Sequence, residues 1–320
     1  MCDPVVRTEE LRRLSEALLR ILAVAAAYYA TGRLGLWQRI ALEGAVVTPL
    51  WLPTGVAVTC LLWMGLRIWP GIALGAFLLI DSINPLRLSD LAIVAANTLA
   101  PMCACVLLRK VGFRLELDRL RDGVALVFLG GLLPILLSAT VGTCVLVLSG
   151  SLEWSAFWTV WAAWWAGDAM GVLVGTPLLI ALSRARPPWN TRRWPEAAAL
   201  LVTAAVITPL ATRSPLALLF LVFPLLTWAA LRFQLAGAAP CVLFVSVLGI
   251  SAATDHVGPF AHHTLFEVMV NLQALNGSAA LTGLLLAAIV TEQKSVRQKI
   301  EQAVRDLTEV VGHLAPRRDE

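Results

Sequence analysis

Residues 157–182, with the sequence FWTVWAAWWAGDAMGVLVGTPLLIAL, form an apolar run that contains a single charged side chain, Asp168. A helix of about twenty residues crosses the hydrocarbon core of a bilayer, so we expect a membrane-spanning helix here. Similar apolar runs, separated by short groups of Arg, Pro and Gly, recur along the chain. This repetition is typical of a polytopic helical membrane protein.

The composition supports the same interpretation. Of the 320 residues, 58% are hydrophobic and 14% are charged, and the mean hydropathy is +0.78. Soluble domains carry about 25% charged residues, so the composition excludes an ordinary water-soluble enzyme. Its many bulky apolar residues exclude a disordered chain. The net charge of +4 is too small to indicate a nucleic-acid partner. We predict an all-α fold, a polytopic helical transmembrane bundle in a lipid bilayer.

We expect about ten spans. Those at 69–83 and 197–212 are short for a full crossing. If one of these two forms a re-entrant pair with a neighbouring span, the count falls to eight and both termini stay on the same side. The ten predicted spans cover residues 14–32, 49–66, 69–83, 91–109, 123–149, 157–182, 197–212, 215–231, 235–254 and 265–291.

Basic residues predict the orientation, because short loops rich in Lys and Arg stay in the cytoplasm. With the N-terminus inside, the outer side holds only four of the 25 Lys and Arg residues. These four are Arg33, Arg39, Arg87 and Arg213. We therefore predict that both termini are cytoplasmic.

Asp168 lies near the midpoint of its span, where a carboxylate is costly and usually faces the bundle interior or a water-filled cavity. Trp154, Trp158, Trp161, Trp165 and Asp168 are spaced 4, 3, 4 and 3 residues apart, so they share one helix face. A carboxylate at the end of an aromatic stripe could hold a cation or an amphipathic ligand. The structural alternative places the first two tryptophans in the interfacial belt and uses Asp168 to cap a backbone break.

Other polar residues at membrane depth extend this hypothesis. Asn97 and Gln273 become part of a site only if they converge on Asp168, and interhelical hydrogen bonding is the simpler explanation of both. The hypothetical ligand-binding set is Asp168, Trp161, Trp164, Trp165, Asn97 and Gln273. Gly167, Gly171 and Gly175 repeat a small-x-x-x-small pattern, which predicts close helix packing.

No chemistry beyond binding is indicated. The six cysteines form no C-x-x-C pair, and we find no phosphate loop, nucleophile elbow or zinc-helix motif. We therefore expect no enzyme activity, no cofactor and no metal. The outer loop 255–263 holds His256, His262 and His263. A metal site there is chemically conceivable, but the spacing matches no zinc signature, and a solvated loop is the favoured interpretation.

Beyond residue 292 the chain leaves the membrane and keeps a helical period. Apolar residues follow a 4-3-4-3-4 spacing, which predicts a short coiled coil that forms a homodimer. A solvated amphipathic tail is the alternative. The predicted signalling-helix residues are Val296, Ile300, Ala303, Leu307, Val310 and Leu314.

Several ordered motifs over residues 20–292 resemble the MASE1 family of bacterial membrane sensory domains. They include Trp51-Leu-Pro-Thr-Gly, Trp69-Pro-Gly, Trp164-Trp-Ala-Gly-Asp168 and Leu281-Thr-Gly-Leu-Leu-Leu-Ala-Ala. The resemblance implies a multi-helix input module in the bacterial cytoplasmic membrane. Such modules are usually joined C-terminally to a histidine kinase, a diguanylate cyclase or another output domain. Here the chain stops where that domain would begin, which leaves a fragment, a stand-alone sensor or a module without signalling as alternatives.

We thus expect three segments: a cytoplasmic segment 1–13, a MASE1-like transmembrane sensory domain 14–291 and a cytoplasmic signalling tail 292–320. The expected function is to detect a small ligand or a membrane state and to relay it through the last helix to a cytoplasmic partner. A two-component signalling context fits this role. The alternative is a small-solute membrane transporter, because broken helices and a midplane carboxylate are also typical of transporters.

Overall fold

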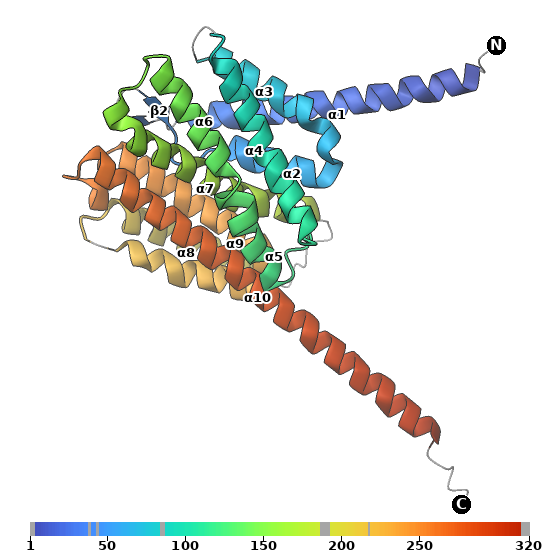
Figure 1. The fold of residues 1–320 in the computed structure, drawn as a ribbon. Coiled ribbons are helices and arrows are strands. Elements are labelled where there is room, and N and C mark those ends of the chain that lie inside the picture. The colour runs from blue at the N-terminus through green and yellow to red at the C-terminus, as the bar shows by residue number, and fades with distance from the viewer. Residues whose placement is uncertain are drawn as a thin grey trace, which may run out of the picture.

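The computed structural model describes residues 4–37, 40–42, 45–83, 87–185, 193–216 and 218–314. Helices dominate these residues, and one short antiparallel hairpin, β1 with β2, lies between α1 and α2 (Figure 1). The predicted helical bundle is confirmed. In chain order the elements are α1 (Pro4–Trp37), β1 (Ile40–Leu42), β2 (Ala45–Val47), α2 (Leu52–Met64), η1 (Leu66–Ile68), α3 (Trp69–Asp81), α4 (Asp90–Lys110), α5 (Leu120–Ala125), η2 (Leu126–Leu132), α6 (Ile135–Leu148), η3 (Trp154–Ala156), α7 (Phe157–Arg184), α8 (Trp194–Arg213), η5 (Leu219–Leu221), α9 (Val222–Thr254), η6 (Gly258–Phe260) and α10 (Leu265–Leu314).

Seven helical segments of the described chain are long and apolar enough to cross a membrane. The count of about ten spans is not confirmed by this measure, because α2 and α3 have only 13 residues each. The seven segments are Arg12–Trp37, Asp90–Lys110, Leu120–Leu148, Trp154–Arg184, Trp194–Arg213, Leu219–Thr254 and Phe266–Val310.

The segment Leu219–Thr254 contains two helical arms, one on each side of Gln234. At Gln234 the backbone leaves the helical region, with φ 51° and ψ −138°. A methyl group built on Gly237 would lie 3.1 Å from the carbonyl oxygen of Ala229, which is eight residues earlier. A continuous helix rises about 1.5 Å per residue, so this approach requires the chain to fold back. The arms correspond to the predicted spans 215–231 and 235–254.

Helix α7 forms the centre of the bundle. In its most apolar stretch 72% of the residues are buried, the largest share among the seven segments. It packs against α2, α6, α9 and α10. The predicted close-packing role of its glycines is confirmed, because Gly167 and Gly171 contact the backbone of Thr48 and Trp51, and Gly175 contacts Gly55 on α2.

Helix α3 packs in parallel against the second half of α1. Gly71 lies against the carbonyl of Ile21, and Gly75 lies against Ala25 and Tyr28. The first half of α1 projects away from the bundle (Figure 1), and its described leucines, such as Leu14 and Leu18, are exposed. The bundle therefore holds α1 through its C-terminal half.

Helix α10 has 50 residues and extends far beyond the bundle (Figure 1). It packs along α9 and is buried at intervals as far as Val290. At the point of exit, the carboxylate of Glu292 accepts a hydrogen bond of 2.9 Å from the backbone N–H of Leu120, at the start of α5. The predicted helix after residue 292 is confirmed as far as Leu314.

Replacement of Gly171 by Ala tests the packing at the centre of the bundle. The new methyl group would overlap the carbonyl oxygen of Trp51, and overpacking of this kind costs about 1–3 kcal/mol of unfolding free energy. Gly277→Ala on α10 is the matched control, because its methyl group meets only the Met170 side chain, at 3.7 Å. Thermal unfolding in detergent should show a lower midpoint for Gly171→Ala alone. Equal midpoints would contradict the packing described here.

Candidate functional site

Asp168 is enclosed by three helices. Its side chain is buried on α7, and only 2% of the residue is exposed. The Thr54 hydroxyl on α2 donates to Oδ1 at 2.9 Å, and the Ser138 hydroxyl on α6 donates to Oδ2 at 2.8 Å. The Trp164 side chain also lies near the carboxylate. One carboxylate thus joins α2, α6 and α7 in the core.

No ion-pair partner for Asp168 occurs among the residues that the structure describes. A charge inside a membrane protein is stabilised only when partners replace the hydration that it loses. Hydrogen bonds to an ionised acceptor are about twice as strong as those between neutral groups. Two hydroxyl donors and the nearby indole supply this compensation. The same arrangement can take up a proton, or exchange a hydroxyl contact for a cationic or hydrogen-bond-donating guest.

A non-helical segment, Thr48–Trp51, lies beside this carboxylate. The backbone N–H of Trp51 donates to the carbonyl of Gly167 at 2.9 Å, in the first half of α7. Proline has no N–H to give to a helix, and Pro49 and Pro53 flank the start of α2. Irregular backbone at membrane depth is tolerated only where protein surrounds it. Gly167 and Gly171 leave room for this segment, which we call the inserted segment.

Gln273 reaches the inserted segment from α10. Its Nε2 donates to the carbonyl of Pro49 at 3.1 Å. Asn97 lies on α4, and within the described chain no hydrogen bond joins it to Asp168, Thr54 or Ser138. The structure therefore brings Gln273 to the neighbourhood of Asp168 but gives Asn97 no such connection.

The tryptophans serve mostly to hold α7 against its neighbours. Trp161 Nε1 donates to Thr140 Oγ1 at 3.0 Å, and Trp165 Nε1 donates to the carbonyl of Leu132 at 2.9 Å. Their rings stack with centroids 6.0 Å apart. Trp154 and Trp158, at the start of the stripe, are 70% and 69% exposed, as interfacial residues are. Among the predicted tryptophans, Trp164 is the one placed to contact the carboxylate.

Neither Thr54 nor Ser138 was among the predicted partners of Asp168. Thr54 lies between Pro53 and Gly55, in the first turn of α2. Ser138 lies in a strongly apolar run, and nothing in its spacing relates it to α7. A hydroxyl in a membrane helix usually bonds to its own backbone, so its sequence position carries little information about a distant partner.

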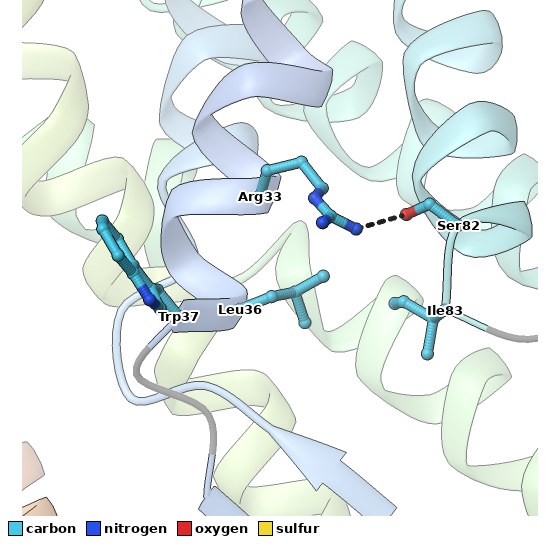
Figure 2. Close-up of a pocket in the computed structure, with 5 residues that line it drawn as sticks. All are labelled: Arg33, Leu36, Trp37, Ser82 and Ile83. Carbon is cyan, nitrogen blue, oxygen red and sulfur yellow. Dashed lines mark hydrogen bonds between the residues drawn. The ribbon is translucent and has the colours of Figure 1, made fainter.

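Two further regions contain polar groups. A pocket of about 430 Å³ lies where α1 and α3 end. There Arg33 Nη1 donates to Ser82 Oγ at 3.4 Å (Figure 2). In the histidine-rich loop, His263 Nδ1 lies 3.4 Å from a carboxylate oxygen of Glu267. Across the described residues, no three His, Cys, Asp or Glu side chains gather closely enough to hold a metal ion.

The family model of MASE1 matches residues 20–294, which is nearly the whole chain. No match was found among curated proteins or among solved structures.

Ser138→Ala should remove one donor to the Asp168 carboxylate. Loss of a hydrogen bond to a charged group costs about 1.5–3 kcal/mol of unfolding free energy. Ser183→Ala, on α7, is the control, since among the described residues the Ser183 hydroxyl bonds only to the Ile180 carbonyl of its own helix. Denaturant unfolding in mixed micelles measures both variants. If the two variants lose the same stability, Ser138 is not a specific partner of the carboxylate.

Proposed function

Since the chain belongs to the MASE1 family of membrane-associated sensory domains, we propose that it detects a small ligand or a membrane state at Asp168. The signal is relayed through α10 to a cytoplasmic partner. One observation carries this proposal: the inserted segment forms hydrogen bonds both to α7, the helix of Asp168, and to α10. Trp51 bonds to Gly167 on α7, and Pro49 bonds to Gln273 on α10.

The relay begins with a change of charge or hydrogen bonding at Asp168. Such a change weakens the Thr54 and Ser138 contacts, which hold α2 and α6 against α7. Thr54 lies only three residues after Trp51, so movement of α2 displaces the inserted segment. The Pro49–Gln273 hydrogen bond then transmits this displacement to α10. A local change in charge is amplified in this way when the packed element has two alternative arrangements.

The proposed topology has ten passes with both termini in the cytoplasm. The reversal at Gln234 supports two passes within Leu219–Thr254. Basic side chains also gather at one end of the bundle, where Arg109 donates to the Leu61 carbonyl and Arg184 pairs with Glu116. By the positive-inside rule this end faces the cytoplasm of a bacterial cell, the same side as the extension of α10.

The proposed output unit is a homodimer formed by α10 beyond the membrane. Val296, Ile300, Leu307 and Val310 are each at least half exposed and lie on the predicted seam. A second copy that pairs through this seam buries these side chains in a short coiled coil. The proposed partner that reads this helix pair is a histidine kinase, a diguanylate cyclase or another output protein.

A small-solute transporter is the second candidate. The inserted segment favours it, because transporters bind their substrates at irregular backbone near the bilayer midplane. Flux of radiolabelled solutes into proteoliposomes distinguishes the two functions, and sustained uptake that depends on Asp168 would favour transport.

Asp168→Asn should shift the position of α10, because the amide keeps the shape of the carboxylate but removes its charge. Spin labels at Arg67 and Arg305 in nanodiscs report the distance between the bundle end and α10. We expect Asp168→Asn to change the distance distribution, and Gln273→Leu to abolish most of that change. Such coupling between the two substitutions is the signature of a shared relay.

Asp81→Asn is the matched control for that experiment, because Asp81 ends α3 and is exposed. The control should leave the distribution unchanged. An Asp168→Asn protein that folds and gives the parental distribution would refute the relay.

A cysteine at Leu307 tests the dimer. We expect Leu307→Cys to form a disulfide-linked dimer in native membranes, because position 307 lies on the seam. Arg305→Cys, on the opposite face of the same turn, should crosslink much less. The parent chain, with its native cysteines, gives the background. Equal crosslinking at both positions would contradict a coiled coil.

A further inference from the structure

Three polar side chains in α8, α9 and α10 are buried without hydrogen-bond partners. Thr208, Ser246 and Asn276 each have an exposed fraction of 0%. Within the described chain, no partner is found for Thr208 Oγ1, for Ser246 Oγ or for either amide atom of Asn276. Buried polar atoms in proteins are almost always satisfied, by protein groups or by ordered water.

The packing register places these residues at one depth. Gly249 on α9 meets Leu272 and Leu275 on α10, and about two turns away Gly283 on α10 meets Val242 on α9. Ser246 lies between the two glycine contacts on α9, and Asn276 lies between them on α10. Both side chains are therefore at the same level of the α9–α10 interface.

Two ion pairs fix the position of α8 along the second arm of α9. Arg213 pairs with Asp255 at 2.8 Å, and Glu196 pairs with Arg232 at the opposite end of α8. Arg213 also donates to Ser251 Oγ at 3.2 Å. Thr208 and Ser246 each lie five residues before these two partners, in helices that run in the same direction, so Thr208 lies within about one turn of the depth of Ser246. The three unpaired groups thus form a row across α8, α9 and α10.

The hydroxyl groups of Thr208 and Ser246 differ from most hydroxyl groups in this bundle in their hydrogen bonding. A membrane-helix hydroxyl commonly donates to the carbonyl four residues earlier, which satisfies it locally. Eight threonines of the described helices follow this pattern: Thr31, Thr59, Thr98, Thr203, Thr212, Thr254, Thr291 and Thr308. Thr208 and Ser246 make no such bond within the described residues. Their hydroxyls remain available to a partner between the helices.

The donors and acceptors of the three side chains indicate what kind of partner could satisfy all of them. A metal cation would bind the Asn276 carbonyl oxygen and the two hydroxyl oxygens, but it would leave the Asn276 NH₂ group unsatisfied. Water both donates and accepts, so it can satisfy every member of the row. We propose that Thr208, Ser246 and Asn276 form a hydrated site, in which ordered water molecules join α8, α9 and α10 inside the bundle.

This site is separate from the Asp168 site and does not depend on the proposed function. Its nearest described reporter is Met170, whose Cε atom lies close to Gly277, the neighbour of Asn276. Met170 and Met269 are 7% and 4% exposed, so the bulk solvent reaches both poorly. Internal water should make Met170 the more reactive of the two toward hydroxyl radicals generated from that water.

Synchrotron radiolytic footprinting of the full chain in nanodiscs, read by mass spectrometry, tests the site. We expect Met170 to oxidise severalfold faster than Met269. The double variant Ser246→Ala with Asn276→Leu should bring Met170 to the rate of Met269 and leave Met269 unchanged. Ser246→Ala alone should give a partial decrease, and it serves as the test if the double variant does not fold.

Two results would show that the site holds no water. Equal oxidation of Met170 and Met269 in the parent chain would overturn the proposal. A Met170 rate that stays the same in a folded Ser246→Ala protein would also overturn it.

Discussion

The contact between the inserted segment and the glycine face of α7 is the constraint on which the rest of the bundle depends. Gly167 and Gly171 let the backbone of Thr48–Trp51 lie directly on the helix, and the Trp51 N–H then bonds to the Gly167 carbonyl. This contact fixes where α2 begins. Because α2 is short and starts inside the bundle, its position brings Thr54 to the Asp168 carboxylate.

The Asp168 carboxylate in turn explains why hydroxyl groups of Thr54 and Ser138 lie inside a largely apolar core. A buried carboxylate without donors would cost several kcal/mol, and its hydroxyl partners come from two different helices. The interaction therefore depends on the correct packing of α2 and α6 against α7. Any change in the charge of Asp168 alters the same packing, which is why one residue is suited both to hold the bundle together and to report on its state.

Helix α10 connects this core to the aqueous phase. It contacts the inserted segment through Gln273, packs along α9, and is held at its exit by the Glu292 contact with the start of α5. Beyond that contact its apolar residues, such as Val296 and Leu307, are exposed.

The amino-acid sequence by itself determined the helical membrane fold, the positions of the apolar segments, the helix beyond residue 292 and the unusual carboxylate at 168. These features depend on hydrophobicity and helical periodicity, which are local properties of the chain. Only the tertiary structure decided that Thr54 and Ser138 bind Asp168, that Gln273 meets Pro49 and that Asn97 joins neither. Those contacts join residues up to 224 positions apart. Their geometry depends on where the inserted segment and the glycines allow backbones to approach, and no spacing within one helix encodes it.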